Sequence, residues 1–204
     1  MAAGTVTTRV FDVLARPYDL PLVQELGYRR NHDVVMRALA RVQPARVLDV
    51  GCGTGILTHR IREELDPEVL VGVDPSAGML ARAQERDPSI DFREGRAEQL
   101  PLDDASVDAV TSTEAFHFFD QPAALAEFSR VLAPGGTLVV VSITTPAAGL
   151  FRHATGGAVS APNRREVLDL VRGAALTVVD QRMVPRLLPG LFTSVATTAR
   201  KPAA

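Results

Sequence analysis

A glycine-rich turn between a short apolar run and a helical pattern constrains this chain more than any other stretch. The apolar run covers residues 47–50, and glycines follow at positions 51, 53 and 55. Glycine accepts positive φ and lets a ligand approach the backbone, because it has no Cβ. In a twisted parallel sheet such a turn lies at the carboxyl end of the first strand, where a ligand crevice forms. The turn therefore predicts a nucleotide-type site in an α/β fold.

The spacing of the glycines distinguishes between classes of site. The dinucleotide fingerprint is G-x-G-x-x-G, whereas here the third glycine comes one residue early and Ile56 stands where the last glycine belongs. The lysine of a phosphate-binding P-loop is also missing. Asp49, just before the turn, disfavours a pyrophosphate and favours a cationic ligand. Cys52, between two glycines, is interpreted as a small turn residue rather than a nucleophile.

Short apolar runs alternate with helical patterns along the chain, which indicates βαβ units and a parallel sheet. Helices are expected near residues 8–15, 21–27, 30–42, 54–66, 76–86, 121–132 and 163–172. Strands are expected near 46–50, 69–73, 90–93, 107–112, 137–142, 176–184 and 191–199. The pattern predicts an α/β sheet with helices on both faces.

The length of 204 residues suits a single domain, 1–204, with a sizeable core. Residues 1–42 are expected to form an N-terminal helical cap. Residues 145–162 have small side chains and little periodicity, which is typical of a lid or binding loop. Because no apolar run reaches 18 residues and the first ten lack the layout of a signal peptide, we expect no membrane span and a cytoplasmic location.

Side-chain chemistry excludes several classes of protein. The single cysteine cannot form an internal disulfide, and the four scattered histidines have no metal-ligand spacing, so no metal is expected. Residues 1–46, 47–149 and 150–204 have net charges of +3, −10 and +5. An acidic centre suits a cationic cofactor. The basic flanks either favour an anionic acceptor or pack against the acidic centre.

A second carboxylate follows at the distance expected for an adenosine cofactor. Asp74 ends the second predicted strand, and an acidic residue about 20 positions after the first glycine of such a turn binds the ribose hydroxyls. Two adjacent O–H donors match the two acceptor oxygens of a carboxylate. Capping of the next helix is an alternative role, but Ser76 is better placed for it, which leaves Asp74 available for the ribose.

Several motifs in the correct order now point to one family. The D-x-G-x-G-x-G pattern at 49–55 resembles motif I of the class I S-adenosylmethionine (SAM)-dependent methyltransferases. G-R-A-E-Q-L-P at 95–101, the stretch 108–119 and R-x-L-x-P-G-G at 130–136 resemble later segments of that family. F-D-x-x-A-x-x-Y-D at 11–19 resembles the opening of the menaquinone/ubiquinone C-methyltransferases. The resemblance covers roughly residues 8–143.

The resemblance implies a Rossmann-like, doubly wound, seven-stranded, mostly parallel sheet with an antiparallel final strand. It also implies SAM as cofactor and S-adenosyl-L-homocysteine as product. The residues that it assigns to the cofactor are Tyr18, Asp49, Gly51, Cys52, Gly53, Gly55, Asp74, Pro75, Met79, Arg96, Ala97, Glu98, Thr113 and Phe116.

The adenine segment departs from the family pattern. Pro75, Met79 and the turn after the third strand would wall the adenine ring. Arg96 stands where the family usually has an aspartate, and a guanidinium cannot accept a hydrogen bond from the adenine amino group. The backbone N–H of Ala97 can still donate. Two alternatives remain for Arg96, stacking over the ring or pointing outward, and Glu98 is the alternative acceptor.

The loop after the fourth strand supplies the candidates for catalysis. Methyl transfer needs alignment of the acceptor with the methyl–sulfur bond and exclusion of water, and a hydroxyl or carbon acceptor must also lose a proton. His117 is the first candidate base; its alternative is a structural histidine among phenylalanines. Three interpretations are open for Glu114: a second candidate base, a ligand for the amino group of the cofactor, or a solvated loop residue. His153, on the predicted lid, is third.

The acceptor is expected to be a small molecule, methylated on oxygen or carbon. The N-P-P-Y-type motif for planar amino groups is absent after the fourth strand, and no nucleic-acid motif appears. The apolar side chains expected near the mouth suit a small acceptor; they are Phe116, Phe118, Phe119, Leu150 and Phe151. A monomer or homodimer is expected. The alternative function is a non-catalytic SAM-binding or regulatory protein, and a nicotinamide oxidoreductase is disfavoured by Ile56.

Overall fold

The computed structural model describes residues 28–144, 160–184 and 193–203 of the chain. Its strands form one seven-stranded sheet in the order β3-β2-β1-β4-β5-β7-β6. The strands are β1 Arg46–Val50, β2 Val69–Asp74, β3 Asp91–Glu94, β4 Val107–Thr113, β5 Leu132–Thr144, β6 Thr177–Val184 and β7 Thr193–Arg200. The helices are α3 Arg29–Val42, α4 Ile56–Leu65, α5 Ala77–Arg86, α6 Gln121–Val131 and α8 Arg164–Gly173, with a 3-10 turn, η1, at Phe116–Phe118.

The sheet has the predicted direction of strands. β1 to β5 run parallel to one another, and β7 lies antiparallel between β5 and β6. The predicted doubly wound, seven-stranded sheet with an antiparallel final strand is therefore confirmed. β5 is longer than expected, because it begins at Leu132 and includes the P-G-G segment. The pairing with β4 is irregular there, and Gly135 has φ of +78°.

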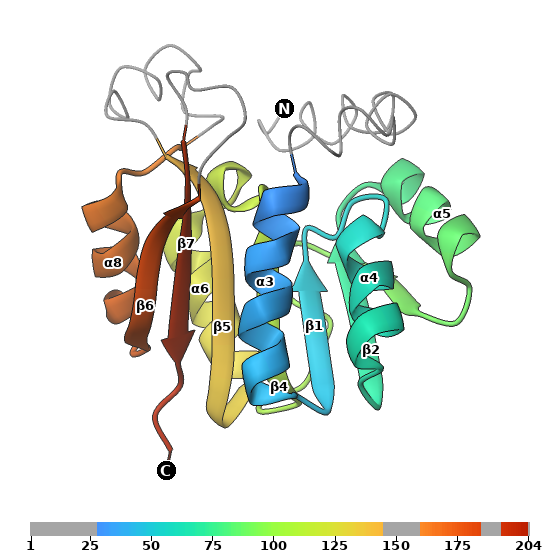
Figure 1. The fold of residues 1–204 in the computed structure, drawn as a ribbon, viewed down its shortest axis with the longest axis horizontal. Helices are drawn as coiled ribbons and strands as arrows, with labels where there is room; N and C mark the ends of the chain where they lie inside the picture. The colour runs from blue at the N-terminus through green and yellow to red at the C-terminus, as the bar shows by residue number, and fades with distance from the viewer. Residues whose placement is uncertain (1–27, 145–159, 185–192, 204) are drawn as a thin grey trace.

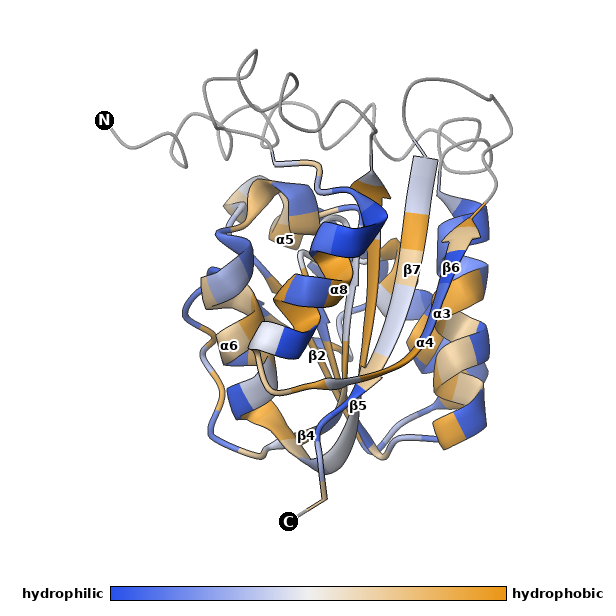
Figure 2. Ribbon diagram, turned by 90° about the vertical axis from the view of Figure 1, so that its left-hand side faces the viewer, coloured by the Kyte–Doolittle hydropathy of each residue, from blue (hydrophilic) through white to orange (hydrophobic). Residues whose placement is uncertain are grey.

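Two apolar cores lie on opposite faces of the sheet. Successive residues of a strand point to opposite faces, so Val47 of β1 contributes to the core under α3 and α4, while Leu48 contributes to the core under α6 and α8. Figure 1 shows α3 and α4 in front of the sheet and α6 behind it. In Figure 2 the apolar sides of the helices face the sheet. α5 packs beside β2 and β3.

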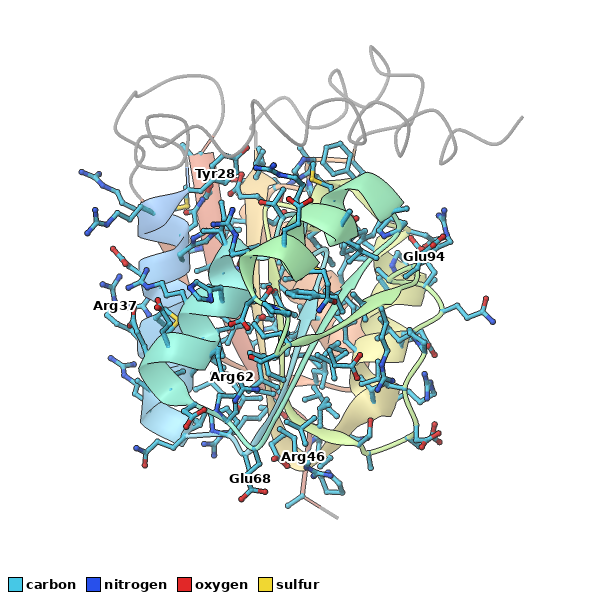
Figure 3. All side chains as sticks on the ribbon, turned by 90° about the vertical axis from the view of Figure 1, so that its right-hand side faces the viewer. Tyr28, Arg37, Arg46, Arg62, Glu68 and Glu94 are labelled. Atoms are coloured by element: carbon cyan, nitrogen blue, oxygen red, sulfur yellow. The ribbon has the colours of Figure 1, made fainter. Side chains whose placement is uncertain are left out.

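The order of the strands defines where a ligand would bind. β1 has β2 on one side and β4 on the other, so the connections after these central strands leave in opposite directions, and crevices form at such a switch point outside the carboxyl ends of the strands. In Figure 3 Tyr28 marks this carboxyl edge, while Arg46 and Glu68 mark the opposite edge. Arg37 and Arg62 point away from the sheet on α3 and α4.

Several predicted features lie outside the described residues. They are the helices at 8–15 and 21–27, Tyr18 and most of the 11–19 motif, the greater part of the predicted lid with His153, and the apolar residues Leu150 and Phe151. Within the part of the chain that the structure describes, every helix is too short or too polar to cross a bilayer.

Candidate cofactor site

The glycine turn adopts the conformation that its sequence predicts. Gly51, Gly53 and Gly55 have φ of +71°, +56° and +74°, a region that side chains with a Cβ disfavour. The amide groups of Gly51 and Cys52 donate to the carbonyl of Val73 at 2.8 and 3.2 Å. The turn thus connects β1 to α4 and is tied to the neighbouring strand β2.

Close packing explains why two of these positions need glycine. A Cβ on Gly51 would collide with the Cβ of Ala115, and a Cβ on Gly55 would lie 2.9 Å from the Cβ of Ala83 and 3.0 Å from the ring of Phe92. A Cβ on Gly53 would meet no atom of the described residues within 4 Å. Within the part of the chain that the structure describes, Gly53 therefore leaves a cradle with room for a bound nucleotide. This geometry fits the SAM that the resemblance implies.

The carboxylate of Asp74 lies beside this cradle at the end of β2. Its Oδ2 accepts from the amide of Gly53 at 3.0 Å, and its Oδ1 accepts from the amide of Ser76 at 2.9 Å. Ser76 caps α5 by accepting from the amide of Met79 at 3.1 Å, as predicted. The sequence did not show that two backbone donors hold Asp74. A carboxylate oxygen can accept more than one hydrogen bond, and the ribose role of Asp74 stays a prediction.

Asp49 lies beneath the turn rather than on its surface. Thr58 donates to its Oδ2 at 2.7 Å and Thr111 to its Oδ1 at 2.9 Å. Burial raises the pKa of Asp49 to about 6, and the charge of Asp74 adds to that rise, although the two hydroxyl donors act against it. Among the described residues, the hydrogen bonds to the Asp49 side chain thus come from the two threonines, and its predicted role toward the cofactor stays a prediction.

A small polar cavity separates the turn from α3. It has a volume of about 20 Å³, enough for one water molecule, and its lining includes His32, Asp49, Cys52 and Thr113. The hydroxyl of Thr113 is buried there and makes no hydrogen bond in the described structure. Burial raises the pKa of the Cys52 thiol well above its usual value, which agrees with its interpretation as a small turn residue.

We expect His32 and Asp49 to give opposite pH dependences of folding stability. Burial and the charge of Arg60 lower the pKa of His32 to about 4, although the charge of Asp33 opposes the shift. Its pKa in an unfolded chain is about 6.5. The unfolded state therefore binds a proton between these values that the folded state does not, and stability is lost as the pH falls through this window, by about 3 kcal/mol.

The pKa of Asp49 is raised instead, so its folded state holds the extra proton between about pH 4 and 6, and the protein gains stability as the pH falls. The His32→Gln variant should keep only the gain of stability at falling pH, which comes from Asp49. The Asp49→Asn variant should keep only the loss of stability, which comes from His32. Urea unfolding at several pH values from 4.5 to 7.5 measures both slopes. Parallel curves for the wild type and the two variants would contradict this expectation.

The predicted adenine segment is held by residues that the sequence analysis did not single out. Arg130 donates to the carbonyls of Leu102 and Leu100 at 2.8 and 3.2 Å, and Glu127 accepts from the amide of Leu100 at 2.8 Å. The Arg130 guanidinium lowers the pKa of Glu127, and Glu127 raises that of Arg130. The arginine of the R-x-L-x-P-G-G motif therefore fixes the turn after β3.

The side chain of Arg96 is exposed, which agrees with the outward-pointing alternative. Its side chain is 59% exposed and lies 3.3 Å from Glu98, whose other oxygen accepts from the amide of Asp120 at 2.9 Å. Glu98 is thus tied to the start of α6. Ala97 is buried in the core beside this turn. The adenine contacts of Arg96, Ala97 and Glu98 remain predictions, as does the wall formed by Pro75 and Met79.

The loop after β4 brings the catalytic candidates to the same edge. Glu114 follows β4 with φ of +58°, is only 9% exposed and accepts hydrogen bonds from Asn31 and Ser194. The alternative of a solvated loop residue is therefore wrong, because the loop folds inward against α3 and β7. His117 is buried in η1, and its ring centroid lies 4.0 Å from that of Phe118. Its role as base or structural residue stays a prediction.

Phe116, in the 3-10 turn after β4, is buried. Its ring is fully buried in the core under α6 and packs edge-on against Phe119 at 6.3 Å between centroids. The ring of Phe116 therefore has a core role, and its predicted contact with the cofactor stays a prediction. A larger groove of about 760 Å³ lies between α6 and α8 and is lined by none of the predicted cofactor residues.

Comparisons with known proteins agree with this arrangement. A family model described as a methyltransferase domain matches residues 48–140. A demethylmenaquinone methyltransferase of Deinococcus radiodurans is 40% identical over 158 residues, which cover 72% of this chain and 64% of that protein. One from Thermus thermophilus is 38% identical over 152 residues, covering 70% of this chain and 68% of that protein.

The solved structures extend the likeness to the fold. One of them is geranyl diphosphate C-methyltransferase from Streptomyces coelicolor, solved with Mg²⁺, geranyl diphosphate and S-adenosyl-L-homocysteine. Its TM-score with this chain is 0.71 at 19% identity, and the match covers 84% of this chain and 78% of that enzyme's chain. The chain spans about 64% of the length of the Deinococcus relative. The identity to the Thermus relative over two thirds of its length confirms the family that the motifs predicted. The chain belongs to the class I S-adenosylmethionine-dependent methyltransferases, in the group of the menaquinone and ubiquinone C-methyltransferases.

Proposed function

We propose that this protein transfers the methyl group of SAM to a small, largely apolar acceptor, and that the acceptor is a quinol ring methylated on carbon. The observation that supports this best is the pairing of the open cradle at Gly53 with the fixed carboxylate of Asp74. Demethylmenaquinone methyltransferases are the relatives that share 38–41% identity with the chain. The proposal that the acceptor is a quinol rests on the names of these relatives.

The residues of the turn and of β2 would hold the cofactor. Gly51, Gly53 and Gly55 provide a backbone surface, Asp74 would accept from the ribose, and the buried charge of Asp49 favours a cation. When bound, SAM supplies an electrophilic methyl group on a positively charged sulfur. The protein's own contribution is to orient the acceptor, to exclude water and to take up a proton.

Binding and transfer are tested separately. Isothermal titration with SAM, S-adenosyl-L-homocysteine and NAD should show binding of the first two and none of NAD. A labelled methyl group should then pass from SAM to a short-chain prenylated naphthoquinol under anaerobic conditions. Binding without transfer to this quinol or to any metabolite of a cell extract would favour the non-catalytic alternative. Binding of NAD alone would overturn the proposal.

Replacement of His117 by alanine tests the first candidate base. If His117 takes a proton from the acceptor, turnover should fall by about a hundredfold, since general bases contribute 10² to 10⁴, while the Kd of S-adenosyl-L-homocysteine changes less than twofold. Unchanged turnover would assign His117 a structural role beside Phe118. Lost cofactor binding would assign it to the cofactor. Thermal unfolding of the variant controls for loss of the fold.

A further inference from the structure

A buried polar cluster joins three distant segments at the carboxyl edge of the sheet. Asn31, in the first turn of α3, donates to Oε1 of Glu114 at 2.7 Å, and the hydroxyl of Ser194, at the start of β7, donates to the same oxygen at 2.9 Å. The Asn31 amide also lies 3.4 Å from the Ser194 hydroxyl. Asn31 and Ser194 are 2% and 0% exposed. The amide and the hydroxyl both donate to one oxygen and thereby orient the carboxyl group.

This cluster lies on the opposite side of β1 from the adenosine part of the predicted site. Asp74 and the glycine turn belong to β2 and β1, whereas Glu114 follows β4 and Ser194 pairs with Ile143 across β5 and β7. α3 packs over β4, β5 and β7 and places Asn31 above them. Ala115, the next residue after Glu114, packs against Gly51. The carboxylate therefore lies close to the cofactor turn, on the half of the edge that the cofactor's adenosine leaves open.

Backbone geometry also fixes the carboxylate. Glu114 has φ of +58°, which is costly for a residue with a Cβ, and its amide donates to the carbonyl of Val141 at 2.9 Å. A residue held in this conformation by its bond to β5 presents its side chain in one direction. Strained, buried and charged positions of this kind concentrate at functional sites.

From these contacts we infer that Glu114 binds and deprotonates a ring hydroxyl of the methyl acceptor, and that Asn31 and Ser194 are its positioning residues. The inference rests on the proposed function. In the proton transfer, the O–H bond of the acceptor breaks, the proton passes to a carboxylate oxygen of Glu114, and the electron pair stays on the ring oxygen. That pair raises the electron density of the neighbouring ring carbons, which makes carbon the nucleophile.

A matched pair of ligands isolates the hydroxyl. The probes are 2-prenyl-1-naphthol and its methyl ether, which differ only in the O–H donor and are not oxidised as readily as a quinol. A hydrogen bond to a charged group contributes about 1.5–3 kcal/mol, so the wild type with bound S-adenosyl-L-homocysteine should bind the naphthol at least about tenfold more tightly than the ether. The ultraviolet spectrum of the bound naphthol should also shift toward that of naphtholate.

The variants separate positioning from folding. Glu114→Gln should abolish the preference for the naphthol, and Asn31→Ala and Ser194→Ala should each reduce it several-fold without changing the Kd of S-adenosyl-L-homocysteine. Ser194→Thr, which keeps the hydroxyl, should restore it. Thr144→Val is the control, because it removes a buried hydroxyl that bonds to Thr193 at the same edge and does not contact Glu114.

Each outcome decides one question. An equal preference in the wild type and in Glu114→Gln would overturn the inference, as would a loss of cofactor binding in Glu114→Gln, which would assign the carboxylate to the cofactor amino group. If S-adenosyl-L-homocysteine binds and a quinol is methylated while the naphthol shows no preference over its ether, the proposed function stands and the inference fails. If the wild type does not bind S-adenosyl-L-homocysteine, the proposed function itself fails.

Discussion

Replacement of Asp74 by alanine should weaken the binding of S-adenosyl-L-homocysteine by at least about a hundredfold. The variant loses the predicted bonds to two ribose hydroxyls, each of which contributes about 1.5–3 kcal/mol when the acceptor is charged. It also loses the acceptors for the amides of Gly53 and Ser76, which hold the turn and the start of α5 in place. Isothermal titration measures the affinity, and urea unfolding measures the accompanying loss of stability.

Ser76→Ala is the matched control for this variant. It removes the cap of α5, which costs about 1 kcal/mol of stability, but it leaves the Asp74 carboxylate beside the amide of Gly53. Asp74→Asn should lie between the two, because an amide retains one acceptor oxygen and loses the charge. If Asp74→Ala binds S-adenosyl-L-homocysteine as well as Ser76→Ala does, the ribose is held by another residue.

Two glycine variants should separate folding from binding within one turn. Gly51→Ala places a Cβ against Ala115 and forces alanine to φ of +71°, so we expect a loss of about 3 kcal/mol in the free energy of unfolding from strain and overpacking together. Gly53→Ala has a φ of +56°, and its new Cβ meets no atom of the described residues within 4 Å. Its stability should fall by only about 1 kcal/mol.

For cofactor binding, Gly53→Ala is the variant with the direct effect, although it is the more stable of the two. The new methyl group of Gly53→Ala extends into the open cradle, so this stable variant should lose at least about tenfold in affinity for S-adenosyl-L-homocysteine, since overpacking costs about 1–3 kcal/mol. Urea unfolding and isothermal titration on the same preparations measure both effects. A Gly53→Ala protein with wild-type affinity would show that the cofactor does not approach the backbone at this position.

Local patterns predicted the half of the site that is built from contiguous residues. The glycine turn, the end of β2 at Asp74 and the cap at Ser76 all lie within one βαβ unit, where strand, turn and helix signals are short-range. Their conformations follow from φ preferences and from alternation of apolar residues, both of which can be identified in the sequence. The order of the motifs further predicted the family and its sheet.

Long-range contacts were not predictable in this way. Asn31 is 83 residues from Glu114 and 163 from Ser194, and within the sequence Asn31 is only a polar residue early in an amphipathic helix. Arg130 was part of a turn motif, and its bonds to Leu100 and Leu102 depend on how α6 lies beside the segment between β3 and β4. The burial of Phe116 likewise depends on α6, which closes over the loop after β4.

By itself, the sequence determined that a glycine turn and the carboxylate of Asp74 occupy the carboxyl edge of a parallel sheet, because backbone freedom and hydrophobic periodicity are properties of neighbouring residues. The tertiary structure alone decided which side chains meet Glu114 and which residues hold the adenine segment. These contacts arise only when β7 inserts between β5 and β6 and α3 covers the sheet, since strand order and helix packing bring together residues that no local pattern connects.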